Sequence, residues 1–312
     1  MKSFAFVFPG QGSQSVGMLD AWGEHAIVKE AIQEANDALN EDFGALIAQG
    51  TKEALALTTN TQPAMLLAGT VAYRMWMHQV GVAPQIVAGH SLGEYTALVA
   101  AGVLAFSDAV GLVRFRAQAM QEAVPVGTGG MAAVLGLPAQ DVKNICEQQT
   151  KETGEVVEAV NFNDLQQTVI AGNKAGVEKA CEALKAAGAK RALILPVSAP
   201  FHSTLMKPAA DKLKERLEQV RFSSPQIPVI NNVDVAFEND PQKIRDALYR
   251  QAFSPVRWVE DMLAIKNKNL TQIVECGPGK VLMGLLKRID TDFAGNAVFN
   301  LETLKTTQKV LT

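Results

Sequence analysis

The sequence predicts an α/β protein whose largely parallel sheet is covered by helices on both faces. Apolar, β-rich runs alternate along the chain with helical patterns, and this alternation is typical of sheets in which each helix carries the chain back across one face. A segment with a different rhythm interrupts the alternation at residues 125–198. We expect the strands of the parallel sheet at residues 4–8, 86–88, 227–230, 273–275 and 297–300.

The composition is that of a soluble globular enzyme. Of the 312 residues, 48% are hydrophobic and 20% are charged, which is ample for a substantial core. The formal net charge of -3 and the pI near 5.9 give no general attraction to nucleic acid or to an anionic membrane. The apolar run at 4–8 is too short for a signal-peptide core. The longest run, 97–106, is about half a membrane span, so we expect a cytoplasmic protein.

Two long helices are expected before the interruption. One covers residues 61–80, with Pro63 tolerated in its first turn, where the missing amide has no partner to lose. The other covers residues 106–124 and is expected to be capped by Ser107. Residues 97–106 are expected to be buried helix with a break at Gly102. The three cysteines form no CxxC motif, so neither a disulfide framework nor a thiolate metal site is predicted: Cys146, Cys181 and Cys276.

The interrupting segment, residues 125–198, predicts an inserted subdomain. Its expected order is strand, helix, two strands, helix and strand, which is the ferredoxin-like β-α-β-β-α-β pattern. The elements are expected at 131–137, 139–150, 156–162, 168–171, 174–187 and 191–197. An amphipathic helical pattern over residues 205–220 then returns the chain to the larger domain.

The segment Gly-His-Ser-Leu-Gly at 89–93 follows one of the apolar runs directly and precedes a helical pattern. This order predicts a nucleophile elbow, a sharp strand-to-helix turn that lifts the Ser91 hydroxyl clear of the backbone. The flanking glycines have no Cβ, so the chain can take a strained turn and pack closely behind the serine. Ser91 is therefore the candidate nucleophile.

A serine nucleophile needs a base, and the chain offers four histidines. His25 and His78 lie in helical patterns, and His90 adjoins the serine, so its ring is expected to point away as a structural support. His202 lies in a loop after a strand pattern, where catalytic groups of α/β folds gather. His202 is the candidate base, and a structural loop histidine is the alternative.

The glycine-rich loop at residues 8–14 is similar to a nucleotide-binding turn but fails that test. Ser15 replaces the third glycine, and neither a P-loop lysine nor a ribose-binding acid is evident. Beside an elbow, such a loop can complete an oxyanion hole together with the N–H of the residue after the nucleophile. The donors would be Gln11 and Leu92, and a tight turn that merely requires glycine is the alternative.

Arg114 and Arg116 lie two residues apart on a predicted helix and cannot share a face. One of them is therefore a candidate for pointing inward. A buried arginine that faces an anionic substrate gains paired, charge-assisted hydrogen bonds to a carboxylate. A structural salt bridge is the alternative for either residue, and the pattern alone does not choose between them.

Together these residues resemble the malonyl-CoA:acyl carrier protein transacylases of fatty acid synthesis, a family related to the acyltransferase domains of polyketide synthases. The resemblance covers essentially the whole chain, and its specificity lies in the order of the motifs. They are PGQGSQ at 9–14, QPA at 62–64, GHSLGE at 89–94, MQEAVPVGTGGM at 120–131, NFN at 161–163, VIAG at 169–172, PFHS at 200–203 and ECGPGKVL at 275–282. The absence of a proline shortly after NFN departs from the family and affects only the local loop.

The resemblance implies an α/β-hydrolase-like core at residues 1–124 and 199–312, interrupted by the ferredoxin-like subdomain at 125–198. It also implies transfer of a malonyl group from malonyl-CoA to the phosphopantetheine thiol of acyl carrier protein, by ping-pong kinetics through a malonyl-serine. The implied roles are nucleophile for Ser91, general base and acid for His202, orientation of that histidine for Gln251, oxyanion donors for Gln11 and Leu92, carboxylate clamp for Arg116 and substrate contact for Phe201.

The resemblance implies no cofactor and no metal. Malonyl-CoA and acyl carrier protein are the expected partners, and we expect a monomer. Because the carrier protein of this pathway is acidic, exposed basic residues are candidate contacts for it, namely Lys185, Lys190, Arg191, Lys280, Lys287 and Arg288.

Two alternatives remain open from the sequence. A serine hydrolase such as a thioesterase would use the same elbow and release the acyl group to water. The usual hydrolase order places an acid and then a histidine late in the chain, whereas no histidine follows His202 here. A noncatalytic acyl-binding module would require Ser91 and His202 to lie more than about 5 Å apart.

Overall fold

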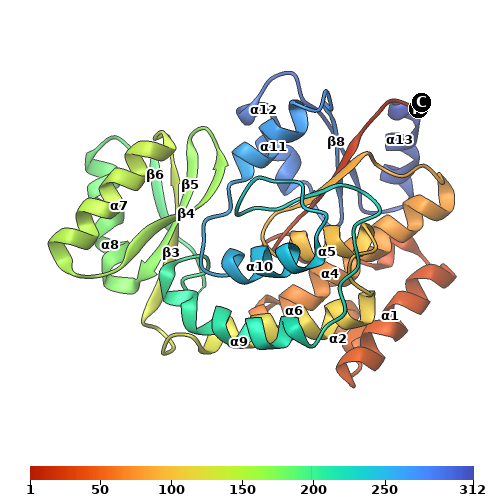
Figure 1. Cartoon of the computed structure of the whole chain (residues 1–312), viewed down its shortest axis with the longest axis horizontal. Helices are drawn as coiled ribbons and strands as arrows, with labels where there is room; N and C mark the ends of the chain where they lie inside the picture. The colour runs from red at the N-terminus through yellow and green to blue at the C-terminus, as the bar shows by residue number, and fades with distance from the viewer. Residues whose placement is uncertain (198) are drawn as a thin grey trace.

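A five-stranded parallel sheet forms the core of the larger part of the protein (Figure 1). The computed structural model describes residues 1–197 and 199–312. The strand order of this sheet is β7-β2-β1-β8-β9, and every neighbouring pair is parallel. Each strand overlaps one of the apolar runs, so the predicted parallel sheet is confirmed. The strands are β1 (Ala5–Phe8), β2 (Ile86–Gly89), β7 (Val229–Ile230), β8 (Gln272–Cys276) and β9 (Ala294–Val298).

Helices cover both faces of this sheet. They are α1 (Ala26–Leu39), α2 (Phe43–Gln49), α3 (Lys52–Ala56), α4 (Thr58–Gln79), α5 (Gly93–Ala100), α6 (Phe106–Glu122), α9 (Lys207–Glu218), α10 (Pro241–Gln251), α11 (Trp258–Lys266), α12 (Val281–Ile289) and α13 (Leu301–Leu311), with short 3₁₀ turns η1 (Asp20–Trp22) and η2 (Thr204–Met206). Along β1, Phe6 and Phe8 pack into one hydrophobic core with α4, α6 and α9. Ala5 and Val7 pack into a second core with α11 and α12. A strand buried on both faces alternates in this way because successive side chains point to opposite sides.

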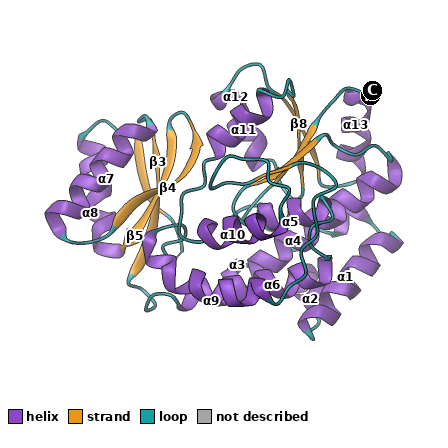
Figure 2. Cartoon of the chain, viewed as in Figure 1, coloured by secondary structure: helices purple, strands orange, loops and turns teal. Residues whose placement is uncertain are grey.

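The interrupting segment folds as a separate antiparallel sheet with two helices on one face (Figure 2). Its elements are β3 (Gly129–Leu135), α7 (Ala139–Thr153), β4 (Val157–Asp164), β5 (Gln167–Asn173), α8 (Lys174–Ala186) and β6 (Arg191–Ile194). The predicted order of strands and helices is confirmed, and the sheet order is β4-β5-β3-β6. Side chains such as Ala132 and Val134 pack under α7 and α8. Met131 and Val169 lie on the opposite face of this sheet, where Phe201 packs against them.

Two details of the predicted helix starts are wrong. Helix α4 begins at Thr58, so Pro63 lies inside the helix and not in its first turn. The earlier start arises because the Leu57 carbonyl already accepts a hydrogen bond from the N–H of Thr61. Helix α6 is preceded by Ala105, which is extended and makes no side-chain capping bond, so the predicted Ser107 cap is wrong.

Two further boundaries differ from the expected ones. The predicted break at Gly102 is confirmed by its φ of 73°, but helix α5 already ends at Ala100, so the apolar run at 97–106 is a helix end, a turn and the start of α6. Strand β6 ends at Ile194, earlier than expected. Within the described ranges, no helix has the combined length and apolar character needed to cross a membrane.

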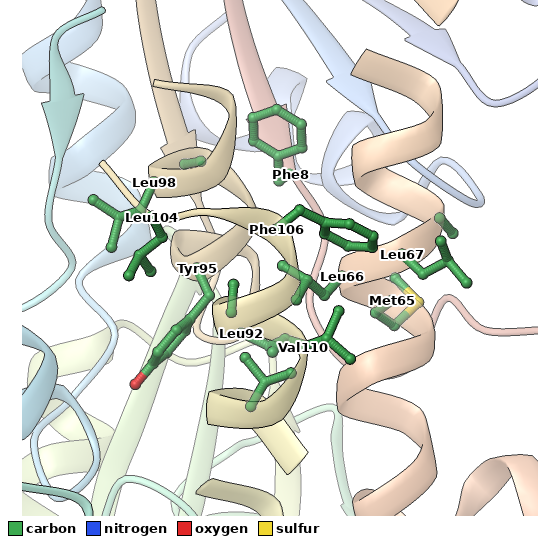
Figure 3. Close-up of a cluster of buried hydrophobic side chains, with 14 of the residues drawn as sticks. Phe8, Met65, Leu66, Leu67, Leu92, Tyr95, Leu98, Leu104, Phe106 and Val110 are labelled. Atoms are coloured by element: carbon green, nitrogen blue, oxygen red, sulfur yellow. The ribbon is translucent and has the colours of Figure 1, made fainter. Parts of the chain in front are cut away.

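The elbow helix α5 packs tightly against the first strand. A Cβ on Gly89 would lie 1.8 Å from the carbonyl carbon of Gly93, and a Cβ on Gly93 would lie 2.0 Å from the Phe8 oxygen. Both glycines of the elbow are therefore required by close backbone contacts. Figure 3 shows the buried side chains around this helix, which include Phe8 of β1, Met65, Leu66 and Leu67 of α4, Leu92, Tyr95 and Leu98 of the elbow, and Phe106 and Val110 of α6.

Candidate active site

The elbow holds Ser91 at the carboxyl end of β2 with a φ of 54°, a left-handed conformation that costs free energy for a residue with a Cβ. The buried side chain of Asn232, just after β7, stabilises this turn. Its Oδ1 accepts a hydrogen bond from the Ser91 N–H at 2.8 Å, and its Nδ2 donates to the Gly89 carbonyl at 2.8 Å. Sequence reasoning missed Asn232. Its position after an expected strand at the same sheet edge was the available signal.

Ser91 and His202 meet directly, although 111 positions separate them in the chain. The distance between Ser91 Oγ and His202 Nε2 is 2.7 Å. The other ring nitrogen, Nδ1, lies 2.8 Å from the backbone carbonyl of Gln251 at the end of α10. The noncatalytic module required a separation above about 5 Å between serine and histidine, so the short distance contradicts that alternative.

The Gln251 carbonyl fixes the tautomer of His202. A carbonyl oxygen can only accept, so Nδ1 carries the proton and Nε2 is left as the acceptor for the Ser91 hydroxyl. Burial, with the positive charge of Arg116 acting in the same direction, lowers the pKa of His202 to about 3. The imidazole is therefore neutral at physiological pH, which is the form that can take a proton from the serine.

The low pKa of His202 predicts a specific acid sensitivity. Its folded pKa lies below the unfolded value of about 6.5, so below that pH only the unfolded chain gains the proton. The contribution of His202 to the free energy of unfolding is fully present above pH 6.5, and it is lost as the pH falls toward the folded pKa. Between pH 6.5 and 5 we expect His202 alone to remove about 2 kcal/mol of unfolding free energy. Urea denaturation at pH 7 and 5 should show this loss in the wild type and a correspondingly smaller one in His202→Gln; equal losses would contradict the assignment.

The structure separates the two arginines of α6. Arg114 points outward, where it pairs with Glu41 and lies over the Phe43 ring at 5.4 Å. Arg116 points inward and is 2% exposed. Its Nη2 lies 3.4 Å from Ser91 Oγ, so a guanidinium stands beside the nucleophile. The choice left open by the sequence is therefore resolved in favour of Arg116 as the inward residue.

Two glutamine amides hold Arg116 in place. Its Nη1 donates to Gln62 Oε1 at 2.7 Å, and its Nη2 donates to Gln251 Oε1 at 3.0 Å. Gln62 in turn donates to the Thr58 hydroxyl at 3.2 Å, and that hydroxyl donates to Gln11 Oε1 at 2.9 Å. The network therefore links the arginine to the glycine-rich loop. Sequence reasoning missed Gln62, and its place in the QPA motif is the signal that could have identified it.

A cavity of about 200 Å³ lies over the serine and histidine between the two sheets. Gln11 and Leu92 both line it, and among the described residues neither backbone N–H has an intramolecular hydrogen-bond partner. These two groups are therefore available to an oxyanion. Phe201 lines the cavity as well, as does His90, whose Nε2 lies 2.8 Å from Asn163 Oδ1 and whose ring packs edge-on against Trp258.

The cavity thus gathers six of the predicted site residues, namely Gln11, Ser91, Leu92, Arg116, Phe201 and His202, together with Gln62, Asn161 and Asn163. Gln251 does not line it and reaches the site through its backbone carbonyl, which contacts His202 Nδ1. In the described ranges, no group of three or more His, Cys, Asp or Glu side chains is arranged to hold a metal ion. All three cysteines are free and buried. The arrangement is suited to acyl transfer through serine, with a neutral histidine base, two free N–H donors and a cation for the acyl group.

Comparisons with known proteins agree with this chemistry. Residues 5–298 match the acyl transferase domain family. The malonyl CoA-acyl carrier protein transacylase of Salmonella typhimurium is 53% identical over 299 residues, which are 96% of each chain.

Solved structures give the same result. The acyl-carrier-protein S-malonyltransferase of Burkholderia pseudomallei 1710b is 60% identical and superimposes with a TM-score of 0.96, covering 99% of this chain and 100% of the other. A malonyl-transacylase solved in complex with a type II PKS acyl-carrier protein is 48% identical, with a TM-score of 0.96 and coverage of 99% and 100%. The chain therefore belongs to the acyl transferase family and, within it, to the malonyl CoA-acyl carrier protein transacylases.

Proposed function

We propose that this enzyme transfers the malonyl group of malonyl-CoA to the phosphopantetheine thiol of acyl carrier protein and so supplies extender units for fatty acid synthesis. Family membership supports the reaction, and one observation supports the acyl group. A buried guanidinium, that of Arg116, stands 3.4 Å from the nucleophile. A free carboxylate on the acyl chain complements that charge with paired hydrogen bonds, whereas a neutral acyl group does not.

In the loading half-reaction, Arg116 binds the malonyl carboxylate and brings the thioester carbonyl over Ser91. His202 Nε2 accepts the serine proton as Oγ attacks the carbonyl carbon, and the N–H groups of Gln11 and Leu92 receive the developing oxyanion. When the tetrahedral intermediate collapses, the carbon–sulfur bond breaks. The CoA sulfur takes the proton from His202, and a malonyl ester remains on Ser91.

The transfer half-reaction runs in the reverse sense. His202 accepts the proton of the phosphopantetheine thiol, the sulfur attacks the malonyl ester, and Ser91 leaves as the alcohol with that proton. Because CoA departs before the carrier protein enters, the reaction follows ping-pong kinetics. The Gln251 carbonyl is a neutral orienting group, so it fixes the ring without adding a negative charge behind it. A thioester is already activated toward acyl transfer, and we propose that no cofactor takes part.

The lifetime of the malonyl-enzyme separates this function from a thioesterase. We expect enzyme labelled with radioactive malonyl-CoA and freed of excess reagent to keep its label for minutes in buffer at pH 7. The label should pass to holo acyl carrier protein within seconds of mixing, because only the carrier supplies a thiol nucleophile. Apo carrier protein, which lacks the phosphopantetheine, is the matched control and should accept nothing. Rapid loss to water that the holo carrier does not accelerate would favour the thioesterase.

The architecture also suits a substrate cleft between two units. We propose an α/β-hydrolase-like catalytic domain at 1–124 and 199–312 and a ferredoxin-like subdomain at 125–198. The elbow at the end of β2 supports the first description. The strand order β4-β5-β3-β6 with two crossover helices supports the second. We further propose that the enzyme works as a monomer in the cytoplasm.

For the acidic carrier protein we retain the exposed basic residues as the proposed contacts. Several of them already have partners within the chain. Arg288 on α12 pairs with Asp164 of β4, and Lys287 donates to the Thr291 carbonyl at 2.8 Å. Lys190 and Arg191, at the start of β6, are exposed and belong to no ion pair among the described residues, so they remain available to a partner, as do Lys185 and Lys280.

A further inference from the structure

The guanidinium of Arg116 is buried, and no carboxylate contacts it directly. The side chain is 2% exposed, and the hydrogen bonds that hold it run to the Gln62 and Gln251 amides and to the Ser91 hydroxyl, all of them uncharged. Its guanidinium also lies over the Tyr95 ring, 5.4 Å from the ring centre. A buried cation of this kind is costly without a nearby anion. The question is where the compensating charge lies before substrate arrives.

Glu94 is connected to Arg116 through one amide. Gln251 Oε1 accepts from Arg116 Nη2 at 3.0 Å, and Gln251 Nε2 donates to Glu94 Oε2 at 2.8 Å. The amide dipole is therefore aligned between cation and carboxylate. Glu94 is 1% exposed and Gln251 is 0% exposed, so little water screens this path. The Asn232 N–H donates to the same Glu94 oxygen at 3.1 Å.

Of the two buried carboxyl groups in this region, Glu94 is the one placed to carry the negative charge. Its Oε2 receives two N–H donors, and Arg116 stabilises the anion. Asp261 is 0% exposed, receives only the Asn232 amide at 2.8 Å, and leaves Oδ1 without a partner. Burial raises the pKa of Asp261 well above its usual value, and the neighbouring Glu94 charge adds to the shift. The buried network therefore balances one cation, Arg116, with one anion.

We propose that Glu94 is the counter-ion of Arg116 in the substrate-free enzyme, acting through the Gln251 amide, and that the malonyl carboxylate competes with it for the guanidinium. Glu94 is thus a positioning residue that sets how strongly the acyl pocket prefers an acid to a neutral acyl group. The inference deepens the proposed function and rests on it.

This competition couples malonyl binding to a proton. Burial raises the pKa of Glu94 to about 7, while the Gln251 and Asn232 donors and Arg116 act in the opposite direction. When the malonyl carboxylate binds Arg116, it weakens the stabilisation that Arg116 gives to the Glu94 anion. Binding of the malonyl group therefore favours the protonated form of Glu94. By linkage, the affinity for malonyl-CoA falls as the pH rises through and above 7.

Asp234, Tyr95 and Glu238 also face Glu94, but none of these three groups titrates near pH 7. Asp234, after β7, pairs with Arg250 of α10, and this pairing lowers its pKa. Burial raises the pKa of Tyr95, next along α5, to about 12. Glu238 lines the small pocket beside Glu94, and hydrogen bonds from neighbouring backbone N–H groups lower its pKa.

The kinetic test compares Glu94→Gln with Glu275→Gln between pH 6 and 9. Glu275 is the matched control, because it is a second buried glutamate that accepts a backbone N–H, from Met283, and it has no contact with the acyl pocket. In the wild type and the control, the ratio of kcat/KM for malonyl-CoA over acetyl-CoA should fall about five- to tenfold across this range. In Glu94→Gln the same ratio should be higher than in the wild type at pH 8, and it should not change with pH. An unchanged profile in Glu94→Gln would overturn the proposal.

A binding measurement separates failure of this inference from failure of the proposed function. Calorimetry of malonyl-CoA binding to Ser91→Ala, in buffers of different ionisation enthalpy at pH 7.5, reports proton uptake without acylation. We expect uptake of a fraction of a proton, none with free CoA, and none in the Ser91→Ala/Glu94→Gln double variant. Binding with equal uptake in the single and double variants would overturn the role of Glu94. Absence of malonyl-CoA binding to both would instead count against the proposed function and, with it, this inference.

If Glu94→Gln does not fold, Glu94→Asp keeps the carboxylate and provides the second variant. It should retain a pH-dependent substrate ratio, because the charge that competes with malonyl is still present. A substrate ratio that does not change with pH in Glu94→Asp, together with the expected proton uptake in Ser91→Ala, would contradict the proposed counter-ion role of Glu94.

Discussion

Replacement of Ser91 by alanine is expected to abolish transfer of radioactive malonyl from malonyl-CoA to the protein and to lower turnover by at least about 10⁴-fold. Ser91 Oγ is the atom that bonds to the acyl carbon, and it is already 2.7 Å from the nitrogen that accepts its proton. Alanine removes this atom and leaves the elbow backbone and its Asn232 contacts available. Binding of malonyl-CoA should therefore survive, and covalent labelling should not. Intact-protein mass spectrometry and gel autoradiography measure the covalent labelling, and calorimetry with malonyl-CoA measures the binding.

The control for this experiment is Ser107→Ala. Ser107 is an exposed serine in the first turn of α6, and it makes no contact with the cavity. The control should acquire the malonyl group like the wild type. Label that persists on Ser91→Ala after denaturation would identify a different nucleophile, and the proposed mechanism would have to be abandoned.

The parts of the fold that depend on local pattern were predictable. The strands of the parallel sheet and the order of the inserted subdomain follow from apolar runs, whose period is visible in the sequence. The ends of elements were not. Helix α4 starts before its apolar stripe, at Thr58, and the extended residue before α6 is Ala105, which has no capping side chain. Both starts are decided by backbone hydrogen bonds and by packing, which a propensity for serine caps does not register.

In the site, the reacting pair was predictable because both members have few competitors. One serine lies in an elbow motif, and one histidine lies in a loop after a strand. The supporting network was not predictable from the residues. Gln62, Glu94 and Asn232 come from three separate elements, and they matter because the fold brings them within hydrogen-bond distance of Arg116, Gln251 or Ser91. Apart from the position of Asn232 after an expected strand, amides and buried carboxyls of this kind have no period or spacing that marks them in the sequence.

The helical period also shows why Arg116 needed the structure. Two arginines two residues apart must point in different directions, but the period does not say which one faces the core. The neighbours decide it. Arg114 finds Glu41 at the surface, whereas Arg116 finds two amides that were already fixed by other bonds. An arginine held by neutral amides is well placed to exchange a weak partner for a substrate carboxylate.

Replacement of Arg116 by alanine should therefore change which substrate the enzyme uses. We expect kcat/KM for malonyl-CoA to fall about 10²-fold or more, because charge-assisted hydrogen bonds to a carboxylate are worth about 1.5–3 kcal/mol each. Acetyl-CoA should be loaded at an equal or higher rate, since a neutral acyl group no longer has to share a pocket with a buried cation. Initial rates of serine acylation with each thioester measure the change. Arg114→Ala is the matched control on the same helix, and it should leave the ratio of the two rates unchanged.

A comparison of the malonyl and acetyl loading rates distinguishes binding of the carboxylate by Arg116 from a purely structural role of this residue. If Arg116 only held Gln62 and Gln251 in position, its loss would disturb the nucleophile equally for both substrates, and the two rates would fall together. If it binds the carboxylate, only the malonyl rate falls. Arg116→Lys refines the distinction, because lysine keeps the charge but lacks the planar fork. It should recover part of the malonyl rate and none of the acetyl gain, since the cation that disfavours a neutral acyl group is still present.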